Sequence, residues 1–259
     1  MVSWMYTVVD VFDLQREIVS IAAYFLDTYV AQNLATSPAE YQLVSLTAFQ
    51  LAIKITESKI FPLQQLVEFS HGGFSEQDVI RTERRMFRVL DWHLHPPTPE
   101  SFLEQYMGLL PVDVSESAKI WIQQVAQKVI ISSTINDTFR RFPPSIVAYA
   151  ATLVTMEQLE AGLLLSQKQA FAVNIQENAD LNNSSTGLLE TYQLLWPFAD
   201  EAIGSRKGLE GEWWNSPEET ASALKADPGA DVKSQIRTET ALSPRNVADE
   251  NLDLLDHIC

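Results

Sequence analysis

One lysine, Lys54, lies within an otherwise apolar stretch that includes Leu51 and Ile55. An ammonium group there requires a carboxylate partner, because an unpaired buried charge is very costly. Glu83 is the candidate, since it lies in a second helical stretch whose apolar side includes Phe87. The pair could offer charge-assisted hydrogen bonds to a partner, or it could close a surface salt bridge of little energetic value. Residue types alone favour the salt bridge.

Other chemistry-bearing residues form no recognisable catalytic or metal-binding pattern. His93 and His95 flank Leu94 without a third ligand, which makes a structural role more plausible than a metal site. The sequence contains neither a glycine-rich phosphate loop nor a nucleophile elbow. Its single cysteine, Cys259, excludes a disulfide within the chain and a cysteine metal site. We therefore expect no catalysis, no metal and no cofactor.

Four arginines recur at helical spacing on one stretch, at Arg81, Arg84, Arg85 and Arg88. Such a stripe could bind phosphate groups, or it could be a solvated helix face. The second interpretation is favoured by the residue pattern.

The charge balance bounds the classes of partner. A formal charge of −16 disfavours nucleic acid, because the phosphate backbone repels an acidic protein. The sequence has no run of about 18 uncharged apolar residues, so we expect no membrane span. Residues 204–259 carry 11 acidic and 6 basic side chains and lose helical periodicity, which predicts a flexible acidic tail.

The elements that must position these residues are all predicted to be helices. Apolar residues at helical spacing predict about five helices on each side of a proline-rich connector at residues 95–99. Ser37 and Ser75 are expected to cap two of them. The third helix of each set is rich in small apolar residues, which is a weak sign of duplication. We predict domains at residues 1–96 and 97–203, followed by the tail at 204–259.

Five segments, in order, resemble the cyclin box. Trp4 precedes Asp27 by 23 residues, as in the first two helices of that family. The other four segments are Tyr41-Gln42-Leu43-Val44 continuing to Leu51-Ala52-Ile53-Lys54-Ile55-Thr56-Glu57, Val79-Ile80-Arg81-Thr82-Glu83 continuing to Trp92-His93-Leu94, Pro97-Thr98-Pro99-Glu100-Ser101-Phe102-Leu103, and Pro143-Pro144-Ser145-Ile146-Val147-Ala148-Tyr149-Ala150-Ala151. The resemblance covers residues 1–203 and implies an all-α fold of two tandem five-helix cyclin-box repeats. It also implies that the first repeat is truncated at its start, without the arginine that would pair with Asp27.

The resemblance implies a regulatory subunit that binds and allosterically activates a cyclin-dependent serine/threonine protein kinase. It also implies substrate or inhibitor proteins as further partners. It places the kinase-binding site at Lys54, Glu83, Leu51, Ile55, Phe87, Trp92 and Leu94. A patch for substrate peptides is implied at Trp4 and Gln42, against the alternative that Trp4 is simply a core residue. The family also implies a nuclear or cytoplasmic location and a role in cell division.

Two departures from the family pattern keep a second function class open: the first helix is incomplete, and Thr56 stands where one of two successive glutamates is usual, which leaves only Glu57. A further departure, Tyr41 in place of the usual leucine, counts against the substrate-peptide patch. The alternative is a cyclin-box scaffold that binds transcription or other partners without activating a kinase. An exposed Lys54–Glu83 pair ringed by exposed Leu51, Ile55 and Phe87 would favour the kinase.

Overall fold

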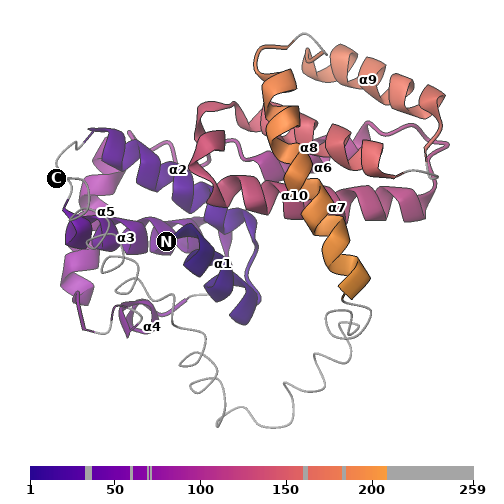
Figure 1. Ribbon diagram of the computed structural model, residues 1–259. Coiled ribbons are helices and arrows are strands. Elements are labelled where there is room, and N and C mark those ends of the chain that lie inside the picture. Colours follow the sequence, from indigo (N-terminus) through magenta and orange to yellow (C-terminus); the bar gives the residue numbers. More distant parts are fainter. Residues whose placement is uncertain are drawn as a thin grey trace, which may run out of the picture. The chain divides into compact units, whose positions relative to one another are not determined.

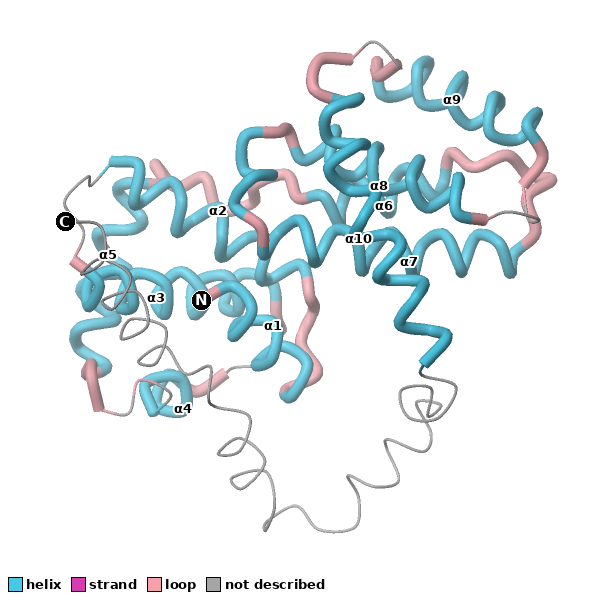
Figure 2. The backbone as a smooth tube through the Cα atoms, in the orientation of Figure 1, coloured by secondary structure: helices cyan, strands magenta, loops and turns pink. Residues whose placement is uncertain are grey.

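The computed structural model describes residues 1–32, 37–58, 61–68, 70, 72–159, 163–182 and 185–208. Within these residues all regular secondary structure is helical, as Figures 1 and 2 show, and this confirms the predicted all-α class. The described residues divide into two compact units between Pro96 and Pro97. Each unit contains five α-helices in its described part. The predicted acidic tail lies outside the described residues from 209 onward.

The first unit is built around one buried helix. Its helices are α1 (Val2–Val11), α2 (Glu17–Gln32), α3 (Pro38–Thr56), α4 (Leu63–Glu68) and α5 (Glu76–Val89). Residues 44–53 of α3 are all buried, and α3 packs against both α2 and α5. A helix that is apolar on nearly every side is stable only when neighbours surround it, so α3 forms the centre of this unit.

Side-chain caps set the starts of the two helices that carry the charged pair. The Ser37 hydroxyl accepts a hydrogen bond from the Glu40 N–H, and Pro38 occupies the first turn of α3. At α5, Ser75 and Asp78 form a reciprocal capping box. Both predicted caps are confirmed, because each satisfies amide groups that the first helical turn leaves without partners.

The second unit repeats the plan of a central helix with neighbours around it. It comprises α6 (Pro99–Gly108), α7 (Glu116–Ile135), α8 (Pro144–Gln158), α9 (Leu165–Ala179) and α10 (Leu188–Gly208), with a short 3₁₀ helix at Asp137–Arg141. Helix α8 is buried along most of its length and packs against α6, α7 and α10. No helix in the described ranges combines the length and apolar character needed to cross a bilayer.

Two local predictions are corrected, and one element had no prediction. Residues 204–208, assigned to the tail, continue α10, because adding residues to a formed helix is easier than nucleating one. Pro99, assigned to the extended connector, opens α6 behind the Thr98 cap, since proline is tolerated in a first turn. The 3₁₀ turn after α7 was not predicted.

Two buried tyrosines in the second unit differ in their hydrogen bonding. The Tyr106 hydroxyl donates to the Ser145 carbonyl at 3.3 Å. The Tyr149 hydroxyl has no hydrogen-bond partner among the described groups. Burial raises the pKa of Tyr106 to about 12, with a smaller contribution from Tyr149, and burial likewise raises the pKa of Tyr149.

We expect Tyr149→Phe to leave the free energy of unfolding unchanged or to raise it by about 1 kcal/mol, because it removes an unsatisfied buried hydroxyl. The matched variant Tyr106→Phe breaks a hydrogen bond and should lower that free energy by about 1 kcal/mol, because the bond from the Tyr106 hydroxyl to the Ser145 carbonyl is lost. Urea unfolding followed by circular dichroism measures both variants. The reverse ranking would contradict the assigned hydrogen bonding.

Candidate functional site

Lys54 and Glu83 form an ion pair between two helices of the first unit. The Lys54 Nζ donates to Glu83 Oε1 at 2.6 Å. The Lys54 side chain is 46% exposed and the Glu83 side chain is 14% exposed. The pair is therefore adjacent and reachable from solvent, as the kinase-binding prediction requires, and not sealed in the core. Glu83 retains a second carboxylate oxygen and Lys54 retains further N–H donors that could serve a partner.

The helix termini favour this placement of charge. Lys54 lies in the last turn of α3, where a cation interacts favourably with the negative end of the helix dipole. Helix α5 starts at its capping box, in which the Ser75 hydroxyl donates to Asp78 at 2.6 Å. This hydrogen bond, the one from the Ser75 amide and the nearby Arg81 hold the pKa of Asp78 below its usual value. The capped start of α5 fixes its register, and the register sets where Glu83 meets α3.

The predicted apolar residues near the pair differ in exposure. Ile55, Phe87 and Leu94 are half-buried. Leu51 is only 1% exposed, so the expectation of an exposed Leu51 is wrong. It packs into the core because residues 44–53 of α3 are surrounded by the rest of the unit. In this conformation Leu51 supports the surface from below instead of forming part of it.

A left-handed turn after α5 presents Trp92. Asp91 and Trp92 have φ values of 46° and 62°, and the Trp92 N–H donates to the Phe87 carbonyl at 3.3 Å. Left-handed geometry at a non-glycine residue costs on the order of 1 kcal/mol and is unusual for a bulky side chain. The turn leaves Trp92 70% exposed and stacked on the Phe87 ring, with centroids 4.8 Å apart. The sequence has no glycine to signal this turn.

Two hydrogen bonds connect other segments of the unit to the ends of the helices that carry Lys54 and Glu83. The Gln32 side chain at the end of α2 donates to the Val89 carbonyl at 3.2 Å, beside the left-handed turn. Glu57, just after α3, accepts from the Gln15 backbone N–H at 3.0 Å. Glu57 therefore ties the loop before α2 to the end of α3. Sequence reasoning identified neither contact, since both join segments far apart in the chain.

The second predicted surface, at Trp4 and Gln42, has a different character. Trp4 is 4% exposed and meets the Phe49 ring edge to face, with centroids 5.8 Å apart. Gln42 is half-buried. Trp4 is thus a core residue here, which was the simpler of the two alternatives. The substrate-peptide patch stays a prediction. In this structure the Trp4 indole is buried and is not available at the surface to contact a peptide.

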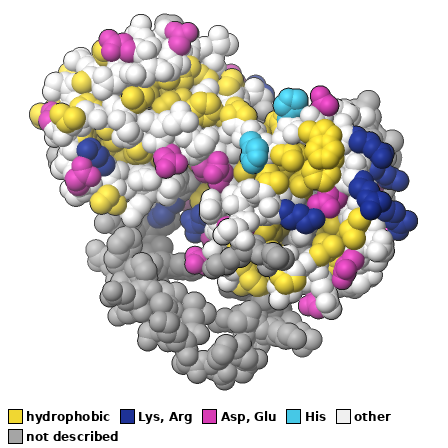
Figure 3. Space-filling view, turned by 180° about the vertical axis from the view of Figure 1, so that it is seen from behind, with side chains coloured by type: hydrophobic (Ala, Val, Ile, Leu, Met, Phe, Trp, Pro, Cys, Tyr) yellow, Lys and Arg dark blue, Asp and Glu magenta, His cyan; other side chains and the backbone are white. Residues whose placement is uncertain are grey.

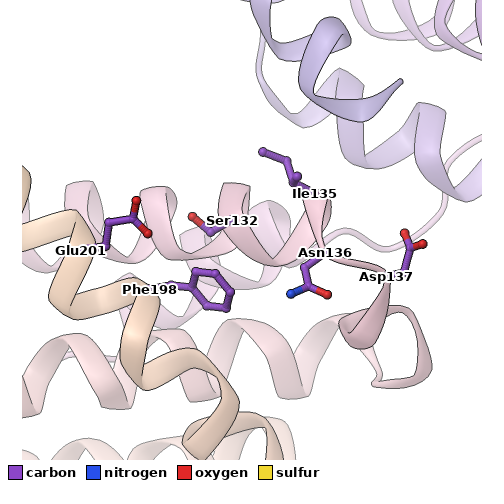
Figure 4. Close-up of a pocket in the computed structure, with 6 residues that line it drawn as sticks. All are labelled: Ser132, Ile135, Asn136, Asp137, Phe198 and Glu201. Atoms are coloured by element: carbon purple, nitrogen blue, oxygen red, sulfur yellow. The ribbon is translucent and has the colours of Figure 1, made fainter. Parts of the chain in front are cut away.

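An open cavity of about 530 Å³ lies in the second unit, between the end of α7 and α10 (Figure 4). It is lined by Ser132, Ile135, Asn136, Asp137, Phe198 and Glu201. The lining offers two carboxylates but neither a nucleophile paired with a base nor a metal-ligand set. In the parts of the chain that the structure describes, no group of three or more histidine, cysteine, aspartate or glutamate side chains could hold a metal ion.

Comparison with known proteins shows that the first unit is similar to cyclins. The family described as "Cyclin, N-terminal domain" matches residues 1–95. A G2/mitotic-specific cyclin-2 of Medicago sativa is 27% identical over 152 residues, covering 58% of this chain and 44% of the relative. Cyclin-A2 of Xenopus laevis is 27% identical over 157 residues, covering 60% of this chain and 36% of the relative. The chain thus matches less than half the length of these relatives.

The fold agrees with that comparison. The crystal structure of a viral cyclin from herpesvirus saimiri aligns with a TM-score of 0.59 at 16% identity. The alignment covers 78% of this chain and 83% of the viral protein, so the likeness extends into the second unit. At this level of identity the likeness speaks for the fold alone.

Proposed function

We propose that this chain, a cyclin-box protein, is a regulatory subunit that binds and activates a cyclin-dependent serine/threonine protein kinase in cell-cycle control. The observation that carries the proposal is the solvent-accessible Lys54–Glu83 pair beside the exposed Trp92. The relatives, which are G2/mitotic and A-type cyclins by name, support the assignment to cell division.

The proposed mechanism is allosteric and uses no chemistry of the chain itself. Lys54 and Glu83 hydrogen-bond backbone groups near the kinase's mobile regulatory helix, while Ile55, Phe87, Trp92 and Leu94 pack against that helix. A mostly apolar surface with a few charge-assisted hydrogen bonds suits such an interface. Binding favours one position of the regulatory helix, which forms the kinase's own lysine–glutamate pair and orders its activation loop.

Further partners and the cellular location are also proposals. The partners would be substrate or inhibitor proteins, and a nuclear location is proposed from the family resemblance. Neither affects the test of kinase binding.

The deciding experiment is a pull-down with a panel of cyclin-dependent kinases, followed by a kinase assay on those that bind. We expect wild type to activate at least one kinase. The double variant Lys54→Ala, Glu83→Ala should bind it about tenfold more weakly, since hydrogen bonds to charged groups contribute about 1.5 kcal/mol. Removing both charges together leaves no unpaired ion behind, so the fold should survive.

The matched control is Asp10→Ala, Arg16→Ala, which removes an exposed ion pair of 2.8 Å from the same unit. It should leave kinase affinity unchanged. Equal losses in both double variants would contradict the proposed site. Kinase binding by wild type without any activation would favour the scaffold alternative, in which the surface docks a partner but does not regulate it.

A further inference from the structure

Helix α5 carries a stripe of arginines on its outward face. Arg81, Arg84, Arg85 and Arg88 are all exposed and follow helical spacing, so they share one side of the helix. Four of the chain's ten arginines thus lie within eight residues, although the net charge is −16. Arg81 pairs with Asp78 at 2.7 Å. In the part of the chain that the structure describes, no carboxylate lies within ion-pair distance of the other three.

An apolar surface borders this arginine stripe. Phe87 lies three residues beyond Arg84, which makes the two side chains neighbours on the helix. The Phe87 ring stacks against the 70% exposed Trp92. Figure 3 shows basic side chains in dark blue beside a yellow apolar area on this unit. The surface therefore places guanidinium groups that have no described carboxylate partner beside the exposed Trp92 ring and the half-buried Phe87 ring.

A ligand that fits this surface must combine carboxylates with bulky apolar side chains. Guanidinium groups bind carboxylates through charge-assisted and often bidentate hydrogen bonds. Contact with the rings of Phe87 and Trp92 would remove leucine-type side chains from water, which is favourable for apolar surface. One segment of this chain has that composition. Residues 249–256 read Asp-Glu-Asn-Leu-Asp-Leu-Leu-Asp, and no lysine or arginine occurs after Arg245.

We infer that residues 249–256 dock on the arginine stripe of α5 and on the adjoining Phe87–Trp92 surface of the same molecule. Asp249, Asp253 and Asp256 pair with arginines, and the leucines cover the rings.

The docking segment is covalently attached to the surface that it would bind. Forty residues separate Gly208, the last described residue of α10, from Asp249. Attachment makes docking an intramolecular event, so weak exposed ion pairs contribute more than they would between separate molecules.

The single cysteine provides the test in the full chain without mutation. A nitroxide attached to Cys259 broadens the NMR signals of nuclei that it approaches closely. We expect strong broadening of the α5 backbone amides and of the Trp92 indole N–H, relative to the reduced label. The broadening should fall several-fold in about 0.5 M NaCl, where the Debye length shrinks to a few ångströms.

Two variants locate the contact. The broadening should be abolished by the triple variant Arg84→Glu, Arg85→Glu, Arg88→Glu. It should also be abolished by the triple variant Asp249→Asn, Asp253→Asn, Asp256→Asn, which changes none of the residues that the structure describes. The control Lys119→Glu, Lys128→Glu, Lys168→Glu changes the charge equally on the second unit and should preserve it. Broadening that is absent in wild type, or that survives the aspartate variant, would overturn the inference.

Other occupants of the stripe give distinct results. Broadening of an isotope-labelled chain by a spin-labelled second copy, in a dilute mixture, would overturn docking within one molecule and indicate pairing of copies. No broadening, with chemical-shift changes on α5 when an acidic phosphopeptide is added, would assign the stripe to a partner protein. The test contains no kinase, so it stands or falls independently of the proposed function.

Discussion

Replacing Trp92 with alanine is expected to weaken kinase binding by about 2–4 kcal/mol, or roughly 30-fold to 1,000-fold in Kd. Tryptophan is enriched among the few residues that dominate binding energies, especially near the centre of an interface. Trp92 is 70% exposed and held outward by the left-handed turn, so docking would bury a large apolar surface. Isothermal titration calorimetry with the kinase identified in the pull-down measures this loss.

The same substitution should change the free energy of unfolding by no more than about 1 kcal/mol, since only the stacking on Phe87 is lost. Tyr24→Ala is the matched control, because Tyr24 is an aromatic residue of the same unit with 42% exposure and lies on α2. It should leave kinase affinity unchanged. If Trp92→Ala binds as wild type does, the kinase surface is misplaced.

The opposite outcome is expected when Trp4 is replaced with alanine. Trp4 is 4% exposed and packed on Phe49, so its removal leaves a large cavity in the first unit. Core substitutions of this kind lower the free energy of unfolding by about 3–5 kcal/mol, which is a large share of an ordinary domain's stability. Urea unfolding followed by tryptophan fluorescence and circular dichroism measures the loss.

Trp4→Phe is the companion variant, since it keeps an aromatic ring in the cavity and should recover a large part of the loss. Kinase affinity at low temperature, where the variants remain folded, should stay near that of wild type. A loss below about 1 kcal/mol, with impaired binding of substrate peptides, would contradict the core assignment and revive the predicted patch.

The two tryptophan variants together separate surface from scaffold. Both residues belong to motifs that resemble the cyclin box, but Trp92 is 70% exposed and Trp4 is 4% exposed. We therefore expect Trp92 to contact a partner and Trp4 to stabilise the core. A change that removes binding without affecting stability identifies a contact residue. A change that lowers stability first identifies a packing residue.

The sequence by itself determined the helical class, the starts of α3 and α5, and the partner of Lys54. Ser37 and Ser75 are recognisable as caps because the hydrogen bonds of a cap involve residues three positions apart. Lys54 and Glu83 are separated by 29 residues, and the apolar stretch around Lys54 indicated a carboxylate partner, which the structure places at 2.6 Å. The penalty of a buried unpaired charge is not the reason for this pairing, because the Lys54 side chain is 46% exposed.

Only the tertiary structure decided which apolar residues face water. Leu51 and Trp92 both resemble interface residues in sequence, yet Leu51 lies in the core and Trp92 is exposed. The difference arises because α3 is surrounded by its neighbours, whereas Asp91 and Trp92 adopt left-handed geometry that no glycine announces. Burial depends on how helices pack from distant parts of the chain, and local residue patterns do not contain that information.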